Sequence, residues 1–148
     1  MSISKTHPFS MLLLTVCGVW LVGLGLYFLF LRPPLLPEDL RFMGTTLAQV
    51  QATVPGLERW LTKVFMVLGG FMASAGVLTV FVARAAIPAR LQGTSWVIAL
   101  SGTLSVALMS VINFSINSDF KWGLLIPALV WLASLGLYAS GISTIFKQ

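Results

Sequence analysis

Few side chains in this sequence could carry out chemistry, and most of those that could lie in one connector. Seven of the charged side chains fall between residues 32 and 63: Arg32, Glu38, Asp39, Arg41, Glu58, Arg59 and Lys63. Glu38 and Asp39 could bind a cation or a headgroup, but adjacent helical residues point in different directions and make a poor chelate or acid–base pair. Two carboxylates in the first turn of a helix more often complement the helix dipole.

The residue types needed for nucleophilic or metal chemistry are scarce. The chain has one cysteine, Cys17, and one histidine, His7, which cannot supply the four ligands of a structural zinc site or a pair of haem ligands. The sequence contains no HExxH motif and no glycine-rich phosphate loop after a strand. It therefore predicts a protein that is not an enzyme and that binds no metal and no cofactor.

The third apolar segment contains three polar side chains that are the best candidates in the chain for a buried polar cluster. Asn113 and Asn117 are four residues apart, and Ser110 precedes Asn113 by one turn, so all three share a helix face. In hydrocarbon such groups need partners, worth about 0.6–2 kcal/mol for each interhelical hydrogen bond. They could line a pocket for the headgroup of a lipid, a quinone or a small molecule, or they could join helices. The second interpretation is favoured, because Asn117 lies only two residues before Asp119.

The composition is that of an integral membrane protein. Hydrophobic residues make up 57% of the chain and charged residues only 9%, whereas soluble domains have about 25% charged residues. The net charge of +5 comes from nine Lys and Arg that are scattered singly, without the clusters and stacking aromatic residues of a nucleic-acid surface. The expected partners are membrane lipids and other membrane proteins, not nucleic acid.

Four apolar segments are long enough to cross a membrane, since a spanning helix needs about 20 residues. They are residues 9–31, 57–83, 95–117 and 122–146. The 148 residues leave no room for a separate soluble domain. The sequence therefore predicts an all-α fold with one domain, residues 1–148, built as a four-helix transmembrane bundle.

The first connector contains a segment with the pattern of an amphipathic helix. Pro37 and Pro55 bracket it, and its apolar residues recur at spacings of three and four: Leu40, Met43, Leu47, Val50 and Val54. The pattern predicts one helix over residues 37–54 that lies on the membrane interface or on top of the bundle. A docking surface for a partner is expected at Glu38, Asp39, Leu40, Arg41, Met43 and Leu47.

The second apolar segment carries small residues with the spacing of close helix contacts. Gly69 and Ala73 are four residues apart, as are Gly70 and Ser74. This spacing lets two helix backbones approach closely, either within one chain or between copies.

Two segments of the chain are almost identical. Residues 19–27 and 130–138 agree at seven of nine positions, including a tryptophan, a glycine and a tyrosine. Because they lie in the first and fourth apolar segments, they would run in opposite directions, as in the inverted repeats of some transporters. Coincidence in a restricted apolar alphabet is favoured, since nothing comparable links the second and third segments.

Three functions remain open from the sequence. The leading one is an accessory or scaffolding subunit that packs against a larger membrane complex or against copies of itself. The second is a binder or small carrier of a lipid- or quinone-like ligand, with its pocket near Asn113. The third is a transporter or channel formed by oligomerisation. The chain has the general character of a small bacterial inner-membrane protein. Four spans put both termini and the turn at residues 84–94 on one face, which carries Lys5, Arg84, Arg90 and Lys147 and no acidic residue. This acid-free face and its shorter connections favour cytoplasmic termini.

Overall fold

The computed structural model describes residues 6–143, and the side chains of residues 8–140. The helices are α1 (Thr6–Phe30), α2 (Pro37–Met43), α3 (Leu47–Thr53), α4 (Leu57–Phe81), α5 (Ile87–Ala89), α6 (Thr94–Gly102), α7 (Leu108–Ser115) and α8 (Lys121–Ser143). Two π-helical turns, η1 (Val82–Ala86) and η2 (Thr103–Ala107), connect α4 to α5 and α6 to α7.

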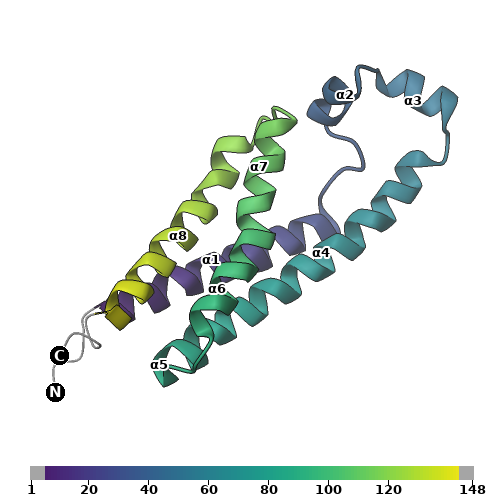
Figure 1. Ribbon diagram of the computed structural model, residues 1–148. Helices are drawn as coiled ribbons and strands as arrows, with labels where there is room; N and C mark the ends of the chain where they lie inside the picture. Colours follow the sequence, from purple (N-terminus) through teal and green to yellow (C-terminus); the bar gives the residue numbers. More distant parts are fainter. Residues whose placement is uncertain (1–5, 144–148) are drawn as a thin grey trace.

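Four of the described helical segments are long and apolar enough to cross a membrane. They are Pro8–Phe30, Leu57–Ala89, Thr94–Ser115 and Lys121–Ser140. The predicted all-α fold with four apolar helices long enough to span a membrane is confirmed. Figure 1 shows them as a bundle, with the connector that contains α2 and α3 at one end.

The second spanning helix extends beyond residue 83, its predicted end. In the π turn η1 the N–H of Ile87 bonds to the carbonyl of Val82, five residues earlier. Pro88 has no N–H and would interrupt a regular helix, but it directly follows Ile87, whose N–H makes the hydrogen bond of this widened turn. The helix therefore ends only at Ala89.

Helices α1 and α4 pack backbone against backbone along a seam of four glycines. Gly18 lies opposite Gly76, and Gly25 lies opposite Gly69. A Cβ on Gly25 would lie 2.6 Å from the carbonyl oxygen of Gly69 and 2.5 Å from the N atom of Ala73. On each helix the two glycines are seven residues apart, which is the repeat of a left-handed helix pair. The seam makes α1 and α4 an antiparallel pair, seen side by side in Figure 1.

Helix α8 packs along the first half of α1 and runs antiparallel to it. The hydroxyl of Ser10 donates to the carbonyl of Ser134, and the hydroxyl of Ser134 donates to the carbonyl of Ser10, both at 2.8 Å. Two turns further along α1, the Sγ of Cys17 lies 3.7 Å from the carbonyl oxygen of Pro127. The buried core lies around these contacts and comprises Leu14, Cys17, Leu21, Ala83, Ile87, Ile98, Val106, Ala128, Trp131 and Tyr138. Beyond them the α7–α8 pair splays away from the α1–α4 pair (Figure 1).

The prediction of one helix over residues 37–54 is wrong, because the segment forms two short helices. Helix α2 ends at Gly44, whose φ of 66° is left-handed and closes the helix. Helix α3 begins at Thr46, whose hydroxyl accepts a hydrogen bond from the N–H of Gln49 at 3.3 Å. The side chain of Gln49 accepts the N–H of Thr46 at 3.0 Å in return. These end signals override the apolar spacing, which continues across the break.

Candidate functional site

One edge of α2 is anchored to the α1–α4 pair by Arg32. Its Nη2 lies 3.3 Å from Asp39 Oδ2, and its Cζ lies 3.6 Å from the ring centroid of Phe65 and 5.1 Å from that of Phe28. Asp39 Oδ2 also accepts the N–H of Leu36 at 2.8 Å, which caps the start of α2. A largely buried guanidinium stacked on aromatic rings and paired with a carboxylate holds α2 at the end of α1.

The other edge of α2 is bonded to the turn between α7 and α8. The hydroxyl of Ser118 donates to Glu38 Oε1 at 2.9 Å, and both residues are buried, with 1% and 4% exposure. Arg41 Nη2 lies 2.9 Å from Asp119 Oδ1 and 3.1 Å from the carbonyl oxygen of Asn117. The buried bond to a carboxylate is worth roughly 1.5–3 kcal/mol, against about 0–1 kcal/mol for the exposed ion pair.

Together these contacts tie the two splayed helix pairs together at their open end, and we call them the latch. The latch consists of Arg32, Glu38, Asp39, Arg41, Ser118 and Asp119. It engages all three charged members of the predicted docking surface inside the chain. Of the apolar members, Leu40 is half-buried, whereas Met43 and Leu47 are exposed. No group of three or more His, Cys, Asp or Glu side chains among the described residues could hold a metal ion.

The three residues predicted to form a ligand pocket make hydrogen bonds within the chain. The hydroxyl of Ser110 donates to the carbonyl of Leu124 at 2.8 Å and so joins α7 to α8. The side-chain amide of Asn113 donates to a backbone carbonyl one turn earlier in its own helix. The side chain of Asn117 accepts a hydrogen bond from Lys121. None of the three lines either of the grooves described below.

The predicted small-residue pairs of α4 lie on two different faces. Gly69 and Ala73 contact α1 in the glycine seam. Gly70 has no atom within 4 Å of the place a Cβ would occupy, and Ser74 is exposed. Within the described part of the chain, the hydroxyl of Ser74 makes no hydrogen bond.

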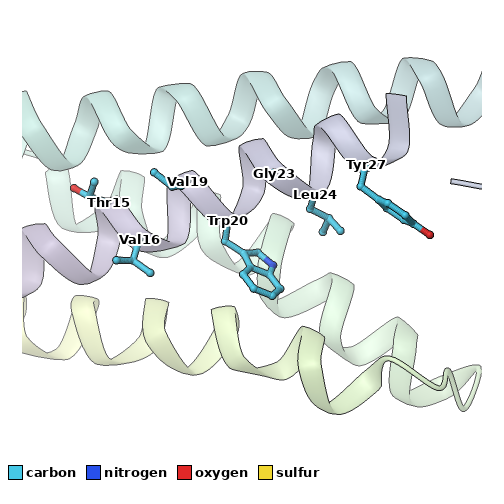
Figure 2. A pocket seen from close by; sticks show the side chains of 7 residues that line it. All are labelled: Thr15, Val16, Val19, Trp20, Gly23, Leu24 and Tyr27. Carbon is cyan, nitrogen blue, oxygen red and sulfur yellow. The ribbon is translucent and has the colours of Figure 1, made fainter. Parts of the chain in front are cut away.

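A shallow, open groove of about 600 Å³ follows α1 on the side away from this seam. It is lined by Thr15, Val16, Val19, Trp20, Gly23, Leu24 and Tyr27. Figure 2 shows Trp20 and Leu24 pointing from α1 to the side away from α4. A smaller groove of about 220 Å³ lies between α4 and α6, and the hydroxyls that line it bond to carbonyls of their own helices.

Trp20 has an unusual position for a tryptophan in a spanning helix. It lies near the middle of the 23-residue segment Pro8–Phe30, whereas tryptophans usually occupy the two membrane interfaces. Its side chain is 43% exposed, and its indole N–H has no hydrogen-bond partner among the described residues. The depth of Trp20 is the sequence signal that could have identified it before the structure was known.

The equivalent tryptophan of the near-identical segment in α8 is completely packed. Trp131 is 5% exposed, and its Nε1 donates to the carbonyl of Ile98 on α6 at 2.9 Å. Its ring lies on Gly102, where a Cβ would come within 2.0 Å of the indole. The carbonyl of Ile98 thus accepts the N–H of Trp131, and Gly102, one turn later, leaves room for its ring. Within the described part of the molecule, Trp20 has no such carbonyl and glycine against it.

Comparison with known proteins supplies no relative: no family model, no curated protein and no solved structure matches the chain.

Proposed function

We propose that this protein is a non-enzymatic membrane protein that acts by packing against other transmembrane helices, as an accessory or scaffolding subunit of a larger complex or homo-oligomer. The observation that carries the proposal is the groove along α1, where Trp20 holds an unpartnered N–H at mid-membrane depth. An unsatisfied donor is costly in hydrocarbon. Trp131 indicates what satisfies it, namely a neighbouring helix with a small residue.

A protein partner fits this groove better than a lipid chain does. An acyl chain could fill the apolar space, but it has no hydrogen-bond acceptor at the depth of Trp20. A helix that carries small residues brings both backbone carbonyls and hydroxyls within reach. Tryptophan is also among the side chains that contribute most to protein interfaces.

The latch and the connector support the same function. The latch braces the two helix pairs at their open end. Helices α2 and α3 expose Phe42, Met43 and Leu47, a second apolar surface that suits the membrane interface or a partner. We place the protein in a bacterial cytoplasmic membrane with cytoplasmic termini. All four acidic residues lie at the opposite end of the bundle: Glu38, Asp39 and Asp119 in the connectors, and Glu58 in the first turn of α4.

Native mass spectrometry of the protein extracted from its own membrane in mild detergent tests this function. We expect assemblies with more than one polypeptide. The Trp20→Ala variant should reduce the assembled fraction by about tenfold or more, because a central tryptophan typically contributes at least 1.4–2 kcal/mol to an interface. Trp96→Ala is the matched control, since Trp96 is exposed at the start of a span. A lone monomer that carries only lipid would refute the proposal and support a lipid binder.

A further inference from the structure

The outer half of the α7–α8 pair takes no part in the buried core. The core and the apolar side chains packed against it include Val106 and Ala107 before α7, and Ala128 and Trp131 in α8. Within the described structure, no residue from 108 to 126 belongs to either group. We call residues 108–126 the limb. Because helices in a membrane are held together by close packing, the limb has little to hold it against the α1–α4 pair.

Both helices of the α7–α8 pair are irregular where the limb begins. In η2 the N–H of Leu108 bonds to the carbonyl of Thr103, which lies five residues earlier. In α8, Pro127 lacks the N–H that would bond to the carbonyl of Gly123. A long helix usually bends at π-helical turns and at prolines. Each of the two helices can therefore bend at the base of the limb.

The two irregular places lie at the same level of the pair. On one side of them, Trp131 of α8 donates to the carbonyl of Ile98 of α6. On the other side, Ser110 of α7 donates to the carbonyl of Leu124 of α8. The turn η2 lies between Ile98 and Ser110, and Pro127 lies between Leu124 and Trp131. Because the same two contacts enclose both, the two helices can turn together, as at one hinge.

Contacts inside the limb join its two helices into one body. The hydrogen bond from Ser110 to the carbonyl of Leu124 lies near its base. Closer to its tip, the rings of Phe114 and Trp122 pack edge to face, with their centroids 5.1 Å apart. A motion at the hinge therefore moves the limb as a unit.

The latch holds the tip of the limb. Among the described residues, the hydrogen bonds and ion pairs between the limb and the rest of the chain beyond the hinge all go to α2. Ser118 donates to Glu38, and Arg41 binds Asp119 and the carbonyl of Asn117. Unlike packed apolar side chains, such polar bonds can be exchanged for bonds to water. The limb thus has a hinge at its base and a breakable attachment at its tip.

We infer that the limb swings about the hinge at η2 and Pro127, and that the latch controls how often it is open. In the closed state, which is the one described here, Glu38 and Arg41 hold the tip of the limb. In the open state these bonds are broken, and the limb stands further from the α1–α4 pair. The inference is independent of the proposed function, since the motion needs no second polypeptide.

Distances between spin labels, measured by double electron–electron resonance in lipid nanodiscs, test the swing. All samples carry Cys17→Ala, so that only the introduced cysteines are labelled. One pair of labels spans the open end of the bundle, at the exposed positions Trp60 of α4 and Val111 of α7. The other pair lies on the opposite side of the hinge, at the exposed positions Phe81 of α4 and Leu132 of α8.

Glu38→Leu is expected to add a second, longer distance between the labels at the open end. The ratio of open to closed limbs should rise about tenfold or more, because the variant removes a hydrogen bond to a buried carboxylate. The distance between the labels at the other end should stay the same. Arg41→Gln removes only the exposed ion pair and should raise the ratio by a smaller factor, up to about fivefold.

Two further variants separate the latch from the hinge. Glu58→Leu makes the matched change outside the latch, since Glu58 is the second residue of α4 as Glu38 is of α2. It should leave both distances as they are in the wild type. Pro127→Ala restores the missing N–H, so combined with Glu38→Leu it should lower the open fraction.

Three results would overturn the inference. The first is an open-end distance that neither Glu38→Leu nor Arg41→Gln changes. The second is equal lengthening at both ends or in Glu58→Leu, because the latch would then have no specific effect on the limb. The third is an open fraction that Pro127→Ala does not reduce, because the limb would then not turn at this hinge.

Discussion

Replacing Gly25 by leucine is expected to force α1 away from α4 and to lower the free energy of unfolding by about 3 kcal/mol, the upper part of the usual range for overpacking. A Cβ at this position would lie 2.5 Å from the backbone N of Ala73 and 2.6 Å from the carbonyl oxygen of Gly69. Backbone atoms cannot move aside as a side chain can, so the helices themselves must separate. Titration with a denaturing detergent, followed by circular dichroism, measures this loss.

The control for this variant is Gly23→Leu, two residues away on the same helix. Gly23 has open space around its Cα, so under conditions that keep the protein monomeric its replacement should not lower the unfolding free energy. Helix propensity favours leucine over glycine equally at both sites and cancels in the comparison. Equal stability of the two variants would show that the glycine seam does not hold α1 and α4 together.

The two tryptophans of the near-identical segments should respond very differently to replacement by alanine. Trp131→Ala is expected to cost about 3 kcal/mol of unfolding free energy, because it empties a packed site and removes the hydrogen bond to Ile98. The value lies at the low end for tryptophan because the ring stays in lipid when the helices separate. Trp20→Ala should cost the monomer less than about 0.5 kcal/mol. The same detergent titration compares them, and equal losses would contradict the different environments seen here.

The sequence was sufficient to predict the fold class but not the connector. Four long apolar runs dictate four spanning helices, because backbone groups in hydrocarbon must be satisfied within a helix. The apolar spacing in residues 37–54 could not reveal the break after α2. The spacing fits one long helix as well as two short ones. Two helices form because Gly44 ends α2 and the Thr46–Gln49 cap begins α3.

The candidate site depended on contacts that no local pattern encodes. Ser118 and Glu38 are 80 residues apart, so the latch follows from how the helix pairs meet. Helical periodicity separates Gly69 from Gly70, but only the packing of α1 shows which of the two is covered. The tryptophans are the clearest case, because nearly identical segments acquire opposite environments from their neighbours. Trp131 lies beside α6, and Trp20 lies beside an open groove.

The most direct test of the account is photo-crosslinking from Val19 in native membranes, with a benzophenone amino acid at this position. Val19 lines the groove along α1 and is exposed. We expect a crosslink from this position to a second polypeptide, which peptide mass spectrometry of the crosslinked product identifies. Crosslinks to lipid alone, at the level given by the exposed Leu132 of α8, would show that no protein covers this face.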